Sequence, residues 1–171
     1  MKRSKKKSSL VLALNTFIFS LLLYTNCMSQ TDFDKKLKSL LSESVPFMYQ
    51  DELNSKMDSV NILDSRSPEE YKTSHIPGSK FVGYDDFETE SVQKLDKEKP
   101  VVIYCSVGYR SEKIGEKLQE MGFKEVYNLW GGIFDWKNNG NDVVNAVGIT
   151  DSVHTYNKSW SKWLKKGEKV Y

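Results

Sequence analysis

The segment with the residue types to do chemistry is a short loop around Cys105, which follows the apolar run from Val101 to Tyr104. A loop of this length between a strand and a helix can turn its backbone N–H groups inward around the cysteine sulfur. The N-terminus of the helix adds partial positive charge. Such a cradle favours an anion, so it should raise the thiolate fraction of Cys105. The thiolate is the nucleophilic form of cysteine, and Cys105 is therefore the candidate catalytic residue.

The neighbours of Cys105 have types and offsets that suit an anion-binding loop. Gly108 permits a backbone turn that a side chain would obstruct, and Arg110 offers a planar, permanently charged group to an oxyanion substrate. Ser111 can cap the following helix and hydrogen-bond the thiolate. The candidate substrate-binding residues are Ser106, Val107, Gly108, Tyr109, Arg110 and Ser111. The alternative is a buried structural cysteine, since free cysteine is often buried, but these neighbours argue against it.

The elements that must position this loop alternate between strands and helices. The β-type run 101–104 is typical of a central strand covered on both faces. Ser67 as N-cap, Pro68 at the first helical position and Glu70 three residues after the cap predict the start of a helix. Further strands are expected at 45–48, 60–64, 80–82 and 126–129, and further helices at 31–44, 50–57, 111–121 and 132–136. This alternation predicts an α/β fold with a largely parallel central sheet, flanked by helices on both faces.

Residues 1–29 have the pattern of a signal peptide. Five cations and no acids precede the apolar run from Leu10 to Tyr24, which has the length of a signal h-region and is short for a membrane span. We expect export to the periplasm or cell envelope, with cleavage after Ser29. Lipidation of Cys27 is an alternative, although Asn26 stands where lipoproteins usually have a small residue, and retention as an anchor is another. Only these two alternatives would hold the protein at a membrane.

Charge and cysteine content exclude several kinds of function. The chain has 25 Lys and Arg and 23 Asp and Glu residues, and the signal segment holds five of the cations and none of the acids. The remainder has a net charge of about −3, which leaves no overall basic face for a polyanion and argues against nucleic-acid binding. Once Cys27 is removed or lipidated, Cys105 is the one cysteine left. A disulfide within the chain, a C-x-x-C redox pair and a cysteine zinc site are then excluded, and we expect neither a metal nor a cofactor.

The chain after the signal peptide has three parts. An amphipathic helix is expected at 30–44, where Phe33, Leu37, Leu40 and Leu41 recur at helical spacing. A domain at 45–140 follows, and then an extension at 141–171. The extension mixes Tyr156, Trp160, Trp163 and Tyr171 with Lys158, Lys162, Lys165, Lys166 and Lys169. We favour a strap packed on the domain with its lysines in water, because large aromatic side chains usually bury when they can. An anionic partner or a membrane surface is the alternative.

Residues 45–140 resemble a rhodanese domain, which covers most of the mature chain. The matching motifs are, in order, Leu63-Asp64-Ser65-Arg66 with Glu70, His75-Ile76-Pro77-Gly78, Cys105-x-x-Gly108-x-Arg110-Ser111, and Leu129-x-Gly131-Gly132 with Trp136. Asp64-Ser65-Arg66 replaces the usual Asp-Val-Arg of the family. The extension lies outside the common domain, so the resemblance says nothing about its role.

The resemblance implies a rhodanese-like fold and a sulfurtransferase of the thiosulfate:cyanide type. The Cys105 thiolate would take the outer sulfur of a small anionic donor such as thiosulfate, release sulfite and hold a persulfide. Cyanide or a thiol would then accept the sulfur, and the backbone cradle would stabilise both the thiolate and the persulfide. Val107 and Tyr109 make the loop less cationic than in members specialised for thiosulfate, which argues against thiosulfate as the physiological donor.

Two other functions stay open. Cysteine phosphatases also use a strand–Cys–loop–Arg–helix cradle, but with a longer loop than the four residues between Cys105 and Arg110. A non-enzymatic rhodanese-like binding module is the second alternative, and loss of the cysteine or the arginine would have favoured it. Asp64 and Arg66 are expected to form an ion pair or cap that holds neighbouring loops, and His75 a turn-organising hydrogen bond, rather than to act in catalysis.

Overall fold

The computed structural model describes residues 32–171, so the predicted signal peptide and its processing sites at Cys27 and Ser29 lie outside the described residues. The chain divides into two compact units at Ser39–Leu40. In the described part of the first unit the chain is helical, with Phe33 and Leu37 buried, as their spacing predicted. Within the described part of the chain, no helix combines the length and the apolar character that a membrane span needs.

This first helix ends at residue 40, so the predicted extent to residue 44 was wrong. Glu43 has a left-handed φ of 57°, which breaks helical geometry. The backbone N–H groups of Ser42 and Ser44 donate to the side chain of Glu112, at 3.0 and 3.3 Å. A carboxylate from a distant part of the sequence thus takes the place of the helical carbonyl acceptors.

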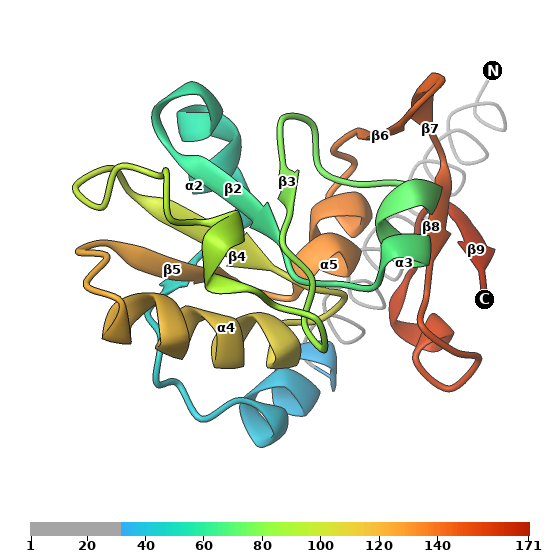
Figure 1. The fold of residues 1–171 in the computed structure, drawn as a ribbon. Helices are drawn as coiled ribbons and strands as arrows, with labels where there is room; N and C mark the ends of the chain where they lie inside the picture. Colours follow the sequence, from blue (N-terminus) through green and yellow to red (C-terminus); the bar gives the residue numbers. More distant parts are fainter. Residues whose placement is uncertain (1–31) are drawn as a thin grey trace, which may run out of the picture. The chain divides into compact units, whose positions relative to one another are not determined.

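The second unit is built on a five-stranded sheet of order β1-β5-β4-β2-β3, in which every pair is parallel. Its strands are β1 (Phe47–Met48), β2 (Asn61–Asp64), β3 (Lys80–Phe81), β4 (Val101–Tyr104) and β5 (Val126–Leu129). Its helices are α2 (Gln50–Lys56), α3 (Pro68–Thr73), α4 (Tyr109–Glu120) and α5 (Gly132–Asn138), with short 3₁₀ helices η1 (Met57–Ser59), η2 (Thr89–Ser91) and η3 (Ser161–Trp163). The predicted α/β fold with a parallel sheet is confirmed (Figure 1). The bounds of β4 and β5 match the prediction, and one end of each of β1, β2 and β3 differs from it by one or two residues.

The central strand β4 is buried at all four positions. Val101 and Ile103 point to one face of the sheet and join Ile114 and Leu118 of α4 in a single buried cluster. Figure 1 shows α4 on one side of the sheet and α2 on the other. The unbroken apolar run at 101–104 therefore reflects cover on both faces.

Helix α4 begins two residues earlier than predicted. Gly108 is its N-cap, with φ of 117°, and the carbonyl of Gly108 accepts the N–H of Glu112 at 3.0 Å. The predicted capping role of Ser111 was therefore wrong, because Ser111 already lies inside the helix. By contrast, the capping box of α3 is confirmed: the Glu70 N–H donates to Ser67 Oγ and the Ser67 N–H to the Glu70 carboxylate.

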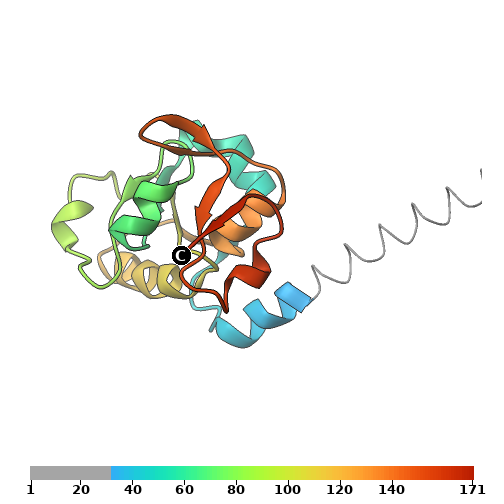
Figure 2. The ribbon, with the colours of Figure 1, turned by 90° about the vertical axis from the view of Figure 1, so that its right-hand side faces the viewer.

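The 141–171 extension belongs to the same compact unit as the sheet. It forms an antiparallel hairpin, β6 (Val143–Asn145) with β7 (Gly148–Thr150), and a parallel pair, β8 (Ser152–His154) with β9 (Glu168–Val170). Figure 2 shows these strands beside α3 and α5. As predicted for a strap, the lysines of the extension are all exposed. Its buried apolar side chains, however, are aliphatic rather than aromatic: Val143, Val153 and Leu164. Tyr156 and Tyr171 stay exposed, at 56% and 62%.

Candidate active site

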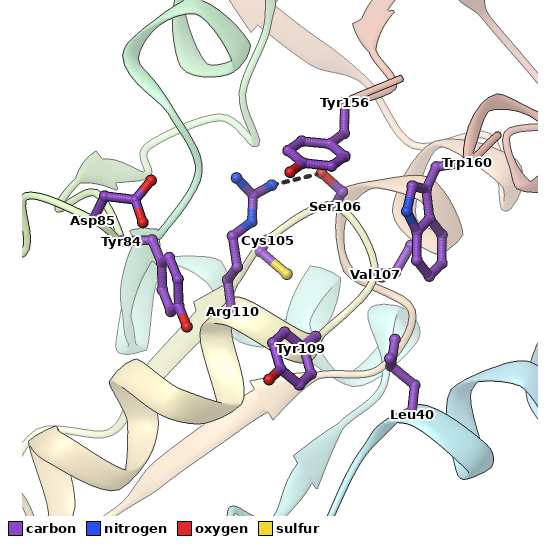
Figure 3. Close-up of a pocket in the computed structure, with 10 residues that line it drawn as sticks. All are labelled: Leu40, Tyr84, Asp85, Cys105, Ser106, Val107, Tyr109, Arg110, Tyr156 and Trp160. Carbon is purple, nitrogen blue, oxygen red and sulfur yellow. Dashed lines mark hydrogen bonds between the residues drawn. The ribbon is translucent and has the colours of Figure 1, made fainter. Parts of the chain in front are cut away.

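The candidate site lies at the carboxyl edge of the parallel sheet, where β2, β3 and β4 end. Ligands of open α/β sheets commonly bind at this edge. A cavity of about 270 Å³ opens there, and Figure 3 shows the Cys105 sulfur in the middle of its lining. The lining residues are Leu40, Tyr84, Asp85, Cys105, Ser106, Val107, Tyr109, Arg110, Tyr156 and Trp160. Among the described residues, no cluster of His, Cys, Asp and Glu could hold a metal ion.

The active loop is held through its carbonyl groups. The carbonyl oxygens of Cys105 and Ser106 accept the N–H groups of Ile133 and Phe134, in the first turn of α5, at 3.0 and 3.2 Å. The carbonyl of Gly108 accepts the Asn128 side-chain amide at 2.9 Å. With these carbonyls bound to α5 and to Asn128, the loop also presents an N–H to the sulfur: the Gly108 N–H donates to Cys105 Sγ at 3.1 Å.

Gly132 makes the close approach of α5 to this loop possible. A Cβ at this position would lie 2.2 Å from the Cys105 carbonyl oxygen, and the φ of 56° also favours glycine. The Gly131-Gly132 pair, which stood among the motifs that resemble a rhodanese domain, is thus part of the support behind Cys105.

Ser111 and Asn128 form a second support. The Ser111 hydroxyl donates to Asn128 Oδ1 at 2.7 Å and lies 3.0 Å from the Gly108 carbonyl. This buried pair fixes the carbonyl side of the loop. The hydrogen bond predicted from Ser111 to the thiolate is therefore replaced by one to Asn128.

Arg110 is bound by Glu70 of α3 rather than presented free at the loop rim. Its Nη1 and Nη2 donate to the two carboxylate oxygens of Glu70, each at 2.7 Å. Ser106 Oγ donates to the same carboxylate at 2.7 Å and accepts from Arg110 Nη2 at 3.0 Å. Bidentate pairs of this kind have defined geometry as well as strength. Arg110 therefore helps to shape the loop, and its charge is largely balanced.

The surroundings of Glu70 and Arg110 favour the charged form of both side chains. Burial alone would raise the pKa of Glu70, but hydrogen bonds and charge from Arg110, the Ser67 N–H and the charge of Arg66 lower it to about 2. Burial likewise opposes the charge of Arg110, yet Glu70 and the nearby Cys105 raise the pKa of the guanidinium above its ordinary value. Glu70 and Arg110 thus stay charged together across the neutral range.

Asp64 and Arg66 form the ion pair that the sequence predicted, whereas the side chain of His75 contacts α3 rather than the turn that follows it. Arg66 Nη2 lies 2.7 Å from Asp64 Oδ2, with both side chains fully buried, and it also donates to the Ser74 carbonyl at 2.6 Å. The His75 ring stacks on Tyr71, and its Nδ1 donates to the Tyr71 carbonyl at 3.0 Å. None of the three lines the cavity.

Five of the seven predicted site residues line the cavity: Cys105, Ser106, Val107, Tyr109 and Arg110. Gly108 and Ser111 are not part of the lining: the Gly108 N–H donates to the Cys105 sulfur, and the Ser111 hydroxyl contacts the Gly108 carbonyl. Sequence reasoning missed Leu40, Tyr84, Asp85, Tyr156 and Trp160 in the lining and Glu70 and Asn128 in the support. Glu70 already stood among the matching motifs, so a carboxylate beside the loop arginine could have been proposed. No local signal marked the others.

Comparison with known proteins shows which family this chain belongs to. The sequence profile of the Rhodanese-like domain matches residues 49–139, just over half of the chain. The chain belongs to the rhodanese-like domain family. The whole of the 141–171 extension, including Tyr156 and Trp160, falls outside the matched part.

Two sequence relatives illustrate the range of this family. Thiosulfate sulfurtransferase GlpE of Coxiella burnetii is 42% identical over 86 residues, which cover 50% of this chain and 78% of that protein. Rhodanese-like/PpiC domain-containing protein 12, chloroplastic, of Arabidopsis thaliana is 36% identical over 115 residues, 61% of this chain. The chain spans only 38% of the length of that second relative.

Solved structures agree with the rhodanese-like fold. A rhodanese-related protein from Thermoplasma volcanium matches with a TM-score of 0.53 and 25% identity, over 58% of this chain and 97% of that one. The BH2092 protein from Bacillus halodurans matches with a TM-score of 0.56 and 22% identity, over 67% and 88% of the two chains, and supports the fold alone.

Proposed function

We propose that the protein is a sulfurtransferase that carries sulfane sulfur on Cys105 as a persulfide. The observation that carries this proposal is the 3.1 Å hydrogen bond from the Gly108 N–H to Cys105 Sγ, with the sulfur facing a cavity. A positioned N–H donor stabilises negative charge on the thiolate and, after transfer, on the persulfide. The similarity to a protein named as a thiosulfate sulfurtransferase supports the same chemistry.

The reaction would proceed in two half-reactions. In the first, the Cys105 thiolate attacks the outer sulfur of the donor, a new sulfur–sulfur bond forms, and the donor's own bond to that sulfur breaks. The electron pair of the broken bond leaves with the donor, as sulfite when the donor is thiosulfate. In the second, a thiolate or cyanide attacks the outer persulfide sulfur, and the bonding pair returns to Cys105 as thiolate.

Intact-protein mass spectrometry tests this proposal. Incubation with thiosulfate or another sulfane-sulfur donor should add about 32 Da, one sulfur atom. The Cys105→Ser variant should fold but take up no sulfur, because its hydroxyl stays protonated near neutral pH. A serine variant that kept more than a few per cent of wild-type turnover would exclude Cys105 as the carrier. Wild-type protein that no donor modifies would indicate a binding module instead.

We also propose export to the periplasm or cell envelope, on the pattern of residues 1–29. N-terminal sequencing of the protein from fractionated cells tests this. A first residue of Gln30 in the soluble envelope fraction supports cleavage, and a lipidated Cys27 in the membrane fraction supports a lipoprotein. An intact Met1 in the cytosol would overturn export.

A further inference from the structure

The cavity around Cys105 has a largely apolar wall. Six of its ten lining residues are aliphatic or aromatic: Leu40, Tyr84, Val107, Tyr109, Tyr156 and Trp160. Its volume of about 270 Å³ is many times the ~10–15 Å³ of cavity volume that holds one water. It therefore has room for an organic group larger than the sulfonyl end of thiosulfate.

The charges of the lining residues are poorly suited to binding an inorganic dianion. Among the described residues of the lining, Arg110 is the one cation, and Glu70 binds its guanidinium with two hydrogen bonds of 2.7 Å. Asp85, also in the lining, adds a carboxylate. A doubly charged anion would lose its hydration here without a matching positive charge, which is costly in a half-enclosed site. An organic group would instead bury apolar surface.

Two of the aromatic residues, Tyr156 and Trp160, come from the extension beyond the family domain. The Tyr156 ring covers the Arg110 guanidinium, with Arg110 Cζ 5.3 Å from the ring centroid, and Figure 3 shows Trp160 beside Val107. The ring thus occupies one face of the guanidinium. The extension both adds apolar surface to the pocket and further restricts access to its cation.

The backbone conformation and the hydrogen bonds around Tyr156 hold its ring over Arg110. Tyr156 has a left-handed φ of 64°, a conformation that a bulky residue adopts only where its surroundings impose it. The buried Thr155 before it donates its N–H to the Val170 carbonyl at 2.7 Å. The Asn157 side chain accepts the N–H groups of Ser159 and Trp160, at 2.9 and 3.2 Å. This turn fixes the two aromatic residues of the wall relative to each other.

We propose that Tyr156 and Trp160 make the pocket selective for sulfane-sulfur donors that carry an apolar or aromatic organic group, over inorganic thiosulfate. This inference rests on the proposed sulfur transfer. An aryl thiosulfonate serves as the example. The Cys105 thiolate attacks its terminal sulfur, the bond from that sulfur to the sulfonyl sulfur breaks, and the electron pair leaves with the aryl sulfinate. The persulfide formed is the same as with thiosulfate, so only recognition of the leaving group differs.

A matched series of donors tests the proposal. Benzenethiosulfonate, methanethiosulfonate and thiosulfate share the same reacting sulfur and differ in the group that leaves. With cyanide as the common acceptor, kcat/KM is measured for each donor from thiocyanate formation. In the wild type we expect the order benzene, methane, thiosulfate. We expect Tyr156→Ala and Trp160→Leu each to lower the ratio of benzenethiosulfonate to methanethiosulfonate by about tenfold.

Tyr171→Ala is the control variant, because Tyr171 is an exposed aromatic residue of the same extension that does not line the cavity. It should leave the donor ratio at its wild-type value. Thermal unfolding separates a changed pocket from a lost fold, and the ratio within one variant is independent of the fraction folded. A wild type that prefers thiosulfate, or variants that keep the wild-type ratio, would overturn the selectivity while sulfur transfer stands. A wild type that no donor loads would overturn the proposed function itself.

Discussion

At the scale of single residues, the carboxylate of Glu70 joins segments that lie far apart in the sequence. It accepts hydrogen bonds from Arg110 and Ser106 of the active loop and from the N–H of Ser67 at the start of its own helix. The loop that carries Cys105 is therefore held from α3 as well as from α5. Arg110 and Glu70 act together, and a change in either should alter the loop as well as the charge.

Arg110→Ala should slow sulfur loading by thiosulfate and by an uncharged polysulfide to a similar extent. Loss of its charge-assisted hydrogen bonds costs about 1.5–3 kcal/mol, or roughly 10- to 150-fold in rate. Arg110→Lys should recover little, because an ammonium cannot reproduce the bidentate geometry. Single-turnover loading rates provide the measurement. A loss confined to thiosulfate would show instead that Arg110 binds the incoming anion, as sequence analysis expected.

The lowered pKa of Glu70 gives a pH dependence of stability. The pKa falls from an ordinary value of 4.5 to about 2, so the ionised carboxylate stabilises the fold fully above pH 4.5. This contribution, about 3 kcal/mol by linkage, should disappear as the pH falls through about 2. Urea unfolding of the wild type and of Glu70→Gln at several pH values measures it. The difference between the two proteins should shrink between pH 4.5 and 2, and a constant difference would contradict the pairing with Arg110.

Cys105 and four of the nine other residues that line its pocket in the described structure could be predicted from sequence, because they lie within the seven consecutive residues 105–111. Cys105, Gly108 and Arg110 have a spacing that itself implies a strand–loop–helix turn. The pairing of Arg110 with Glu70 spans forty positions. Residue types in the loop therefore suggested a free cation, whereas the fold supplies its counter-charge.

At the scale of elements, the packing of α5 against the active loop depends on one glycine. Gly132→Ala should place its Cβ against the Cys105 carbonyl, which lies 2.2 Å away, and also impose a left-handed φ on alanine. We expect a loss of about 2–4 kcal/mol in unfolding free energy and a large loss of sulfur loading. Urea unfolding and mass spectrometry measure the two effects.

Gly122→Ala provides the matched control for this variant. Gly122 also has a positive φ, of 90°, but a Cβ there would meet nothing within 4 Å. It should cost only about 1 kcal/mol of conformational strain and leave loading unchanged. Equal effects of the two substitutions would mean that strain, rather than the contact with the loop, explains the result.

The helix and strand periodicities of the domain predicted its elements well, because their apolar faces pack on one sheet. The errors occur where a distant side chain replaces a local partner. The first helix stops at residue 40 because Glu112 binds the N–H groups of Ser42 and Ser44. The short strands of the extension, three residues each, had no periodicity long enough to detect.

At the scale of the whole molecule, Cys105 is the one cysteine among residues 32–171. If Cys27 is removed or lipidated, no second thiol is available to resolve the persulfide as an intramolecular disulfide. The added sulfur should therefore persist after the donor is removed, and excess small thiol should discharge it as sulfide. Mass spectra recorded over time, with and without thiol, measure this. Loss of the sulfur within seconds in the absence of an acceptor would contradict a carrier role.

The family and the parallel sheet could be predicted for the molecule as a whole, but the contribution of the extension to the pocket could not. The aromatic and lysine residues of 141–171 indicated a strap, and nothing in their spacing placed Tyr156 above Arg110. That position depends on a left-handed turn and on a strand pair closed over thirteen intervening residues.

The parallel pairing of β8 with β9 ties both ends of the 155–167 segment together. Three-residue strands are the kind of structure that opens locally, long before a central sheet unfolds. Each such opening would free Tyr156 and Trp160 from the pocket while Cys105 keeps its hydrogen bond to Gly108. The molecule would then exist as two exchanging populations that both contain the Cys105 thiolate. One would select among sulfur donors, and the other, permissive population would not. Amide hydrogen exchange at Thr155, whose N–H donates across this pair to Val170, would report the fraction of time spent in the permissive one.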